Sequence, residues 1–337
     1  MRTSRDRIAA SLLVLCLSIV GSSLRAMDRI QVSADGRSFV QHPSGKPFVP
    51  WGFNYDHDRD GRLIEDYWET EWDTVAADFQ EMKDLGANVV RVHLQFGKLM
   101  TSPELANGKE LERLTKLLAL AEQTELYLDL TGLGCYHKAD VPDWYDTLKE
   151  ADRWRAQGVF WEAVAQRCAD SPAIFCYDLM NEPVAPAGKK RADDWLGPAF
   201  GDKHFVQRIG LELGDRERTE VATAWIDQLV AAIRKHDQDH LVTVGLVPWS
   251  LKRPGLQSGF EPEVVTGSLD FVAVHLYPEA GKLDEALETL RGFDVGKPVV
   301  IEETFTLKCG GDQLRDFIRQ SRGVADGWIG FYWGVTP

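Results

Sequence analysis

The chain has 337 residues, of which 44% are hydrophobic and 27% charged, and its formal net charge is −14. These proportions are those of an ordinary globular protein with enough apolar residues to bury a large core. The negative charge argues against nucleic acid or an anionic membrane surface as a partner, because both bind clusters of Lys and Arg. A neutral polymer remains compatible with this charge.

The N-terminus has the pattern of a secretory signal peptide. Arg2, Arg5 and Arg7 precede an apolar run over residues 8–20, and small residues follow it. This run is too short to cross a bilayer of about 30 Å as a helix. We therefore expect residues 1–26 to be a signal peptide, and the mature chain to be secreted (extracellular or periplasmic) and free of the membrane. An uncleaved N-terminal anchor is the alternative.

Residues 27–337 are expected to form one domain, since no repeat, low-complexity segment or Pro-rich linker divides them. A short hairpin is predicted over residues 30–42, with its turn at Asp35-Gly36. Eight apolar runs then follow that are typical of buried parallel strands: 48–54, 87–92, 126–130, 173–179, 241–245, 271–275, 298–301 and 328–333. Between them lie amphipathic stretches with apolar residues three and four apart, which indicate helices.

This alternation predicts an α/β fold in which helices cover a parallel sheet. Eight strands favour a closed (β/α)8 TIM barrel, and an open doubly wound sheet is the competitor. No Gly-rich phosphate loop follows the first strand, which disfavours a nucleotide-binding fold. Segment 184–214, after the fourth strand, is long and charged, and we expect it to be a loop insertion.

Polar side chains gather where the predicted strands end, which is where barrels of this kind carry their functional residues. Asn181 and Glu182 follow the fourth strand almost directly, and Glu302 and Glu303 follow the seventh. Other strand ends carry Arg91, His275, Tyr277 and Trp333.

Two carboxyl groups that face one cleft from different strands are what glycoside hydrolysis requires. One protonates the leaving oxygen and later activates water, and the other attacks the anomeric carbon. We expect no cofactor. A metal between the carboxylates is the alternative, but the histidines and cysteines lack the spacing of a ligand set, so we expect none. Cys168 and Cys176 could form a disulfide or remain buried thiols.

Residues 177–183 (Tyr-Asp-Leu-Met-Asn-Glu-Pro) resemble the strand-four signature of glycoside hydrolase family 5, the cellulase and mannanase family of (β/α)8 barrels. Shorter segments resemble the same family in the expected order: 86–91, 274–278, 297–303 and 330–333. The resemblance covers nearly the whole chain after residue 52. It implies that Glu182 is the acid/base, that Glu303 is the nucleophile and that Asn181 donates to the sugar 2-hydroxyl. Because neighbours on a strand face opposite ways, we choose Glu303 over Glu302.

The resemblance also implies the roles of the residues around this pair. Arg91 and Tyr277 would hold the nucleophile, His275 would bridge toward the acid/base, and Trp333 would floor the −1 sugar subsite. The alternative for Trp333 is that it packs against the core.

Three features depart from the family pattern. Asp129-Leu130 is followed by Thr131, where the family usually has a histidine, and we expect that His137 could reach back to replace it. Thr304 and Phe305 follow Glu303 in place of an aromatic residue and a glycine. The sequence also ends four residues after Trp333, so we expect either a truncated C-terminus or another cover where an eighth outer helix would lie.

The sequence thus predicts a retaining β-glycoside hydrolase that cleaves a β-linked glucan or mannan by double displacement. Its partner would be a polysaccharide or oligosaccharide, and we expect a monomer. The loop insertion over 184–214 would be one wall of the substrate groove and restrict which chains enter. The alternatives are a transglycosylase or an exo-acting β-glycosidase on the same site, and a carbohydrate-binding barrel without activity.

Overall fold

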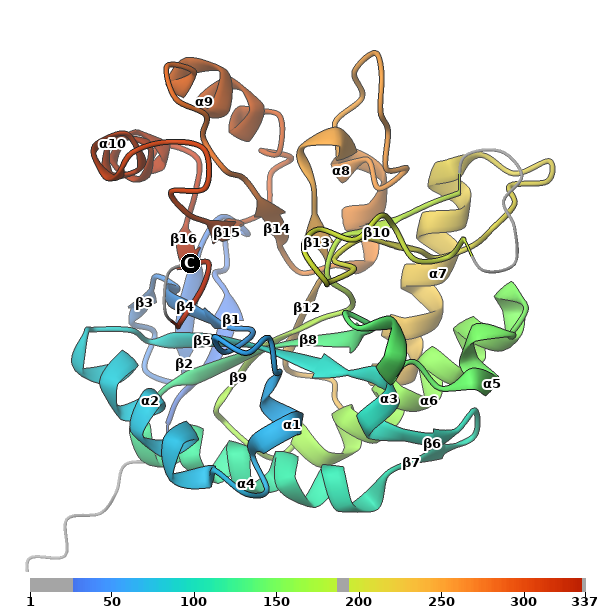
Figure 1. Ribbon diagram of the computed structural model, residues 1–337. Coiled ribbons are helices and arrows are strands. Elements are labelled where there is room, and N and C mark those ends of the chain that lie inside the picture. The colour runs from blue at the N-terminus through green and yellow to red at the C-terminus, as the bar shows by residue number, and fades with distance from the viewer. Residues whose placement is uncertain (1–26, 187–193, 335–337) are drawn as a thin grey trace, which may run out of the picture.

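The computed structural model describes residues 27–186 and 194–334 (Figure 1). The signal peptide expected over residues 1–26 and part of the expected loop insertion lie outside the described residues. The described chain forms a ring of strands with helices around it.

Nine strand segments form one parallel sheet. They are β4 (Trp51–Tyr55), β5 (Val89–Gln95), β8 (Tyr127–Gly134), β9 (Ile174–Asp178), β12 (Leu241–Thr243), β13 (Gly245–Leu246), β14 (Val272–His275), β15 (Val299–Thr304) and β16 (Gly327–Gly330). The order is β12-β9-β8-β5-β4-β16-β15-β14-β13. Since β12 and β13 are consecutive parts of one strand interrupted at Val244, the two ends of this order meet. The sheet therefore closes, which confirms the predicted (β/α)8 barrel.

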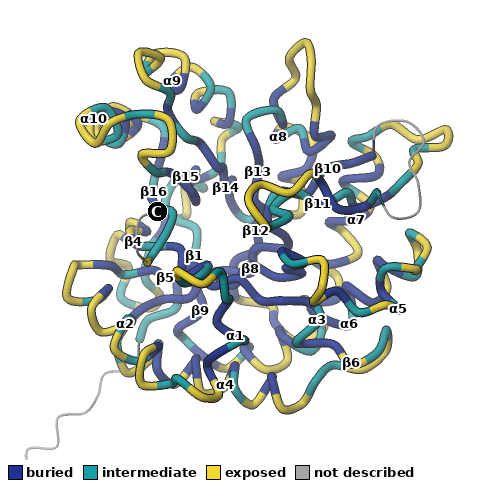
Figure 2. The backbone as a smooth tube through the Cα atoms, viewed as in Figure 1, coloured by how far each residue is buried: buried dark blue, intermediate teal, exposed yellow. Residues whose placement is uncertain are grey.

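The barrel strands are buried because helices cover them on the outside (Figure 2). The helices that connect successive strands are α2 (Trp72–Asp84), α4 (Gly108–Thr124), α6 (Glu150–Cys168), α7 (Arg218–Ile233), α8 (Pro262–Val265), α9 (Leu283–Arg291) and α10 (Gly311–Ser321). Helix α2 shows the pattern: Val75, Phe79 and Met82 lie on one face and are buried against the barrel. It stops before Gly86, whose φ of 89° is a conformation that glycine adopts without strain.

The predicted hairpin is present and closes the N-terminal end of the barrel. β1 (Arg29–Val32) pairs antiparallel with β2 (Phe39–His42), and β3 (Pro47–Phe48) adds a third strand. The ring of Phe39 packs edge-to-face against Phe175 and Phe271, with centroids 5.3 Å apart in both pairs. These rings stand at the starts of β9 and β14, so the hairpin seals the end opposite the strand termini that carry the polar residues.

The loops at the C-terminal ends of the strands contain the remaining short elements. These are α1 (Ile64–Tyr67), α3 (Phe96–Leu99), β6 (Met100–Ser102), β7 (Leu105–Ala106), α5 (Asp143–Asp146), β10 (Pro183–Val184) and β11 (Gln207–Arg208). β10, at the start of the expected loop insertion, pairs in parallel with β11 inside it, so the described part of the insertion is tied back to the barrel.

Cys168 and Cys176 do not pair: all four cysteines of the described residues are free thiols. Within residues 27–186 and 194–334, no helix is long and apolar enough to cross a membrane. No helix follows β16 in the part of the chain that is described, which ends at residue 334.

Candidate active site

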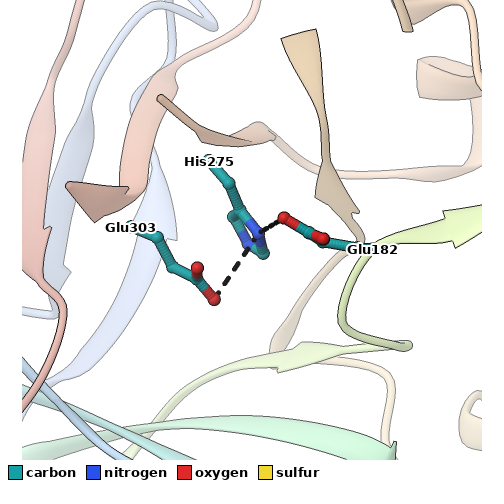
Figure 3. Close-up of side chains that lie close together, drawn as sticks. All are labelled: Glu182, His275 and Glu303. Carbon is teal, nitrogen blue, oxygen red and sulfur yellow. Dashed lines mark hydrogen bonds and ion pairs between the residues drawn. The ribbon is translucent and has the colours of Figure 1, made fainter. Parts of the chain in front are cut away.

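Glu182, His275 and Glu303 come together at the C-terminal end of the barrel (Figure 3). His275 Nδ1 lies 3.0 Å from Oε1 of Glu182 and 3.5 Å from Oε1 of Glu303. One carboxylate oxygen of Glu182 and one of Glu303 lie within 4.8 Å of each other. The two expected carboxyl groups therefore face each other from the ends of β9 and β15.

Glu182 stands on a strained backbone. Its φ of 41° lies in the left-handed region, which residues other than glycine rarely adopt. The parallel pairing of Pro183 with Gln207 follows directly and fixes the chain just beyond Glu182. Strain of this kind, held by surrounding structure, is common at functional sites.

Glu303 is held by two donors, as the resemblance implied. Nη1 of Arg91 donates to Oε1 of Glu303 at 2.5 Å, and the Tyr277 hydroxyl donates to Oε2 at 2.7 Å. Burial raises the pKa of the Glu303 carboxyl, while the positive charges of His275 and Arg91 and the Tyr277 hydrogen bond act in the opposite direction. Burial also raises the pKa of the Tyr277 hydroxyl, so it stays protonated and able to donate.

Arg91 organises the floor of the site from β5, where its side chain is fully buried. In addition to Glu303 it donates to Asn54 at 2.8 Å, to Asp178 at 2.8 Å and to Asn181 at 3.0 Å. The Asn181 amide also donates one hydrogen to the carbonyl of Phe205 at 3.0 Å. Its second N–H remains to donate to a substrate hydroxyl.

A bulge in β15 lets two successive glutamates reach the interior. Ile301 pairs with Val274, but the next pair is Glu303 with His275, so Glu302 is an extra residue in the strand. We expected successive side chains to alternate strictly between the two faces of the strand, and this alternation does not hold at Glu302 and Glu303. The side chain of Glu302 is fully buried and that of Glu303 is 7% exposed, so Glu303 is the one at the mouth.

His275 lies between the catalytic pair and the carboxylate of Glu302. Its Nδ1 faces Glu182, and its Nε2 lies 3.2 Å from Oε2 of Glu302. Burial alone would lower the pKa of His275, but the Glu303 charge and the hydrogen bonds to Glu182 and Glu302 raise it to about 10. His275 is therefore a cation at neutral pH, and both ring nitrogens donate.

A second set of acidic residues lies beneath the first and was not expected from the sequence. One carboxylate oxygen from each of Asp129, Asp178 and Glu302 lies within 4.8 Å of the others. Thr131, at the position where the family usually has a histidine, donates to Asp178 at 2.8 Å. Burial and the charge of Glu302 raise the pKa of Asp129 well above its ordinary value.

His93 and Tyr136 extend the network on the side of β5 and β8. Asn54 Oδ1 accepts from Arg91, so His93 Nε2, 3.1 Å away, must be a donor to it. The Tyr136 hydroxyl then donates to His93 Nδ1, with the two atoms 2.5 Å apart. Burial and the charge of Arg91 lower the pKa of His93 to about 3, so this ring is neutral. His137 does not join the site and instead contacts the carbonyl of Gly61 at 2.9 Å.

Trp333 is partly buried and packs against the hydrophobic core. Its ring packs edge-to-face against Phe53, with centroids 5.4 Å apart, and its backbone N–H donates to the carbonyl of Asn54. Phe331, which directly follows β16, has its ring centroid 6.5 Å from that of Tyr277, the residue that donates to Glu303. The sugar platform expected at Trp333 therefore has a second candidate in Phe331, two residues earlier in the chain.

Glu182, His275 and Glu303 have the residue types of a metal site, and their ligand atoms lie close enough for one. Both ring nitrogens of His275 already contact carboxylates, Nδ1 that of Glu182 at 3.0 Å and Nε2 that of Glu302 at 3.2 Å. Gly245 leaves room for this ring, because a Cβ there would lie 2.8 Å from His275 Nε2.

Comparison with known proteins agrees with this geometry. Residues 43–334 match the cellulase family, glycosyl hydrolase family 5. A probable mannan endo-1,4-β-mannosidase C of Aspergillus terreus is 31% identical over 126 residues, which cover 34% of this chain and 25% of the relative. The matched regions span between 25% and 48% of the curated relatives.

Two solved structures share the fold. An exo-β-1,4-mannosidase from Opitutaceae bacterium strain TAV5 superposes with a TM-score of 0.66 at 17% identity, over 89% of this chain and 54% of that one. A β-1,4-mannanase from the sea hare Aplysia kurodai gives a TM-score of 0.65 at 16% identity, over 90% of this chain and 92% of that one. With the family match over residues 43–334, the chain belongs to the cellulase family, glycosyl hydrolase family 5.

Proposed function

We propose that this protein is a retaining β-glycosidase that hydrolyses β-linked mannan or its oligosaccharides, with Glu303 as nucleophile and Glu182 as acid/base. The observation that carries the proposal is the approach of the two carboxylates to within 4.8 Å. Retaining enzymes place this pair about 5–5.5 Å apart, whereas inverting enzymes leave about 6.5–9.5 Å for a water molecule.

The reaction proceeds in two displacements. Glu303 attacks the anomeric carbon and forms a bond to it, while Glu182 gives its proton to the glycosidic oxygen and the shortened chain leaves. Glu182, now ionised, takes a proton from water, and the oxygen of that water attacks the anomeric carbon. The bond to Glu303 breaks, so the sugar leaves with its original configuration and both carboxyl groups return to their starting states.

The surroundings of the pair distinguish the two carboxyl groups. Two carboxyl groups this close do not ionise together easily. Arg91 and Tyr277 both aim donors at Glu303, and these favour its charged form, which the attack on the anomeric carbon needs. We therefore assign the attack to Glu303 and the proton transfer to Glu182.

Mannan is favoured over glucan by the relatives. The curated relatives, which match this chain over part of their length, are named mannan endo-1,4-β-mannosidases. The same site geometry is compatible with a transglycosylase, in which a sugar hydroxyl replaces water in the second step. A barrel that only binds carbohydrate would have no use for two carboxyl groups that face each other within 4.8 Å.

The stereochemistry of the product tests the mechanism. Hydrolysis of an aryl β-mannoside, followed by proton NMR from the first minutes, should give the β-anomer of mannose before mutarotation. Initial appearance of the α-anomer would contradict retention. A parallel panel of soluble mannan and β-glucan tests the substrate, and Glu303→Gln should reduce turnover on either by roughly 10⁴-fold or more.

Secretion is part of the same proposal, because a polysaccharide substrate lies outside the cell. The expected signal peptide over residues 1–26 supports it. Fractionation of the native host should place the processed chain in the medium or periplasm.

A further inference from the structure

Three aromatic residues from different loops form a continuous row beside the catalytic pair. Tyr136 follows β8, Phe205 lies just before β11, and Phe331 follows β16. The Phe205 ring centroid is 5.7 Å from that of Tyr136 and 6.4 Å from that of Phe331. We call Tyr136, Phe205 and Phe331 the aromatic wall.

Phe205 is fixed in this position from several sides. Its carbonyl accepts from the Asn181 amide at 3.0 Å, and the neighbouring His204 N–H donates to the carbonyl of Tyr136 at 2.8 Å. Two residues further on, Gln207 pairs with Pro183 and its buried side chain donates to the carbonyl of Leu133 at 2.8 Å. The wall is therefore built into the barrel and is not a loose loop that a substrate could displace at little cost.

The wall continues toward β4. The imidazole of His57, which follows β4, stacks on Tyr332 with ring centroids 4.2 Å apart. It also lies 6.5 Å from the Phe331 ring. In the sheet order, β8, β5 and β4 lie between β9 and β16, whereas β13 and β14 lie on the other side of the catalytic pair. The aromatic wall and His57 thus stand over one half of the barrel mouth.

This half is where the non-reducing part of a chain would lie. If the proposed function holds, the sugar that reacts lies against Phe331, with its anomeric carbon between Glu182 and Glu303. Because Glu182 must reach the glycosidic oxygen and its backbone lies beside Gly245 of β13, the leaving group then points to the side of β13 and β14. Any sugar attached to its non-reducing end extends the opposite way, toward Phe205, whose ring stands at 83° to that of Phe331. The two rings form a floor and a side wall.

The exposure of the glutamates agrees with restricted access. Only 15% of the Glu182 side chain and 7% of the Glu303 side chain are exposed. We infer that the enzyme is exo-acting: it removes single terminal mannose units from the non-reducing ends of β-linked chains, and the aromatic wall blocks the glycone side beyond the sugar that reacts. This inference rests on the proposed function and concerns only where along the chain that function acts.

The order of product release tests this inference. Mannohexaose reduced at its reducing end should yield mannose and the shortened alditol from the first time point, with no mannobiose or mannotriose. The viscosity of soluble mannan should fall little for each bond cleaved. Early release of di- and trisaccharides, with a rapid fall in viscosity, would overturn the inference while leaving the proposed function intact. Failure to cleave aryl β-mannoside, mannohexaose and polysaccharides would instead contradict the proposed function.

A pair of variants tests the wall itself. Phe205→Ala should open the glycone side, so that the ratio of di- and trisaccharides to mannose rises by roughly tenfold. Phe200→Ala is the matched control, because Phe200 belongs to the same segment but is 69% exposed. It should keep the wild-type pattern. An unchanged pattern in a folded Phe205→Ala protein would contradict the assignment, and if that variant does not fold, the wild-type product pattern decides alone.

Discussion

The Tyr277 hydroxyl donates a 2.7 Å hydrogen bond to Oε2 of Glu303, the carboxylate oxygen that Arg91 does not contact. The two oxygens of Glu303 are thus each held by a separate donor. Burial raises the pKa of this carboxyl, and the Tyr277 hydrogen bond acts against that increase. The position of the acid limb of the activity profile depends on this balance.

Removal of the Tyr277 hydroxyl should move the acid limb of the pH–activity profile to higher pH. Glu303 must be ionised to attack, so activity is lost as the pH falls through its pKa. In the wild type this limb should already lie above about 4.3, the ordinary value for a glutamic acid, because burial raises the pKa of Glu303. Tyr277→Phe removes a hydrogen bond that lowers this pKa, so the limb should move further up. The profile of kcat/KM against pH measures it, and an unmoved limb would show that another group sets it.

Replacement of Glu182 should separate substrates by their leaving groups. An aryl β-mannoside with a nitrophenol leaving group needs little protonation, whereas a mannan bond needs a proton from the acid. Glu182→Ala should therefore lower kcat/KM on mannan by roughly 10²–10⁴-fold and affect formation of the glycosyl-enzyme from the activated substrate far less. Equal losses on both substrates would mean that Glu182 is not the acid.

The charge on His275 should make stability depend on pH. Its pKa is raised from 6.5 to about 10 in the folded protein, mainly by Glu303 and the hydrogen bonds to Glu182 and Glu302 acting against burial. A group whose pKa is raised on folding stabilises fully below its unfolded pKa, and this contribution is lost as the pH rises through the folded pKa. The Tm difference between wild type and His275→Gln should therefore be largest below about pH 6.5 and shrink toward pH 10.

The control for this measurement is His42→Gln, at an exposed position of the N-terminal hairpin. Its Tm should follow that of the wild type over the whole range. A Tm difference for His275→Gln that stays constant or grows with pH would contradict a buried cation at this position.

The fold could be predicted because its signals are local. Each barrel strand is a short apolar run, buried on both faces, and Asn181-Glu182 follows one such run almost directly. The closure of the barrel followed from counting these runs, and the interruption at Val244 changes neither their number nor their order.

The fine structure of the site could not be predicted because it depends on contacts between distant segments. The bulge at Glu302 arises from the pairing of β15 with β14. The alternation of residues along β15 alone does not indicate it. The position of Phe205 depends on Asn181, 24 residues earlier in the chain. A long loop with aromatic residues indicated a wall, but not which ring would form it.

Trp333 and Phe331 lie two residues apart in the chain but in different surroundings. Trp333 packs against Phe53 on the barrel core, so Trp333→Ala should cost about 2 kcal/mol of unfolding free energy and lower the Tm by several degrees. Its kcat per folded molecule should stay close to that of the wild type.

Phe331 lies beside Tyr277 and Phe205, so its ring is placed to stack on the sugar whose anomeric carbon Glu303 attacks. Some of that contact should be realised only in the transition state, since it orients the anomeric carbon. Phe331→Ala should therefore lower kcat/KM by roughly tenfold or more, equivalent to about 1.4 kcal/mol, with a fall in kcat as well as a rise in KM. Tm and kinetic constants measured on the same preparations separate the two residues. The reverse result would be a catalytic loss in Trp333→Ala and only a loss of Tm in Phe331→Ala. It would show that Trp333 is the sugar platform, because a ring that only packs against the core cannot change kcat in a protein that remains folded.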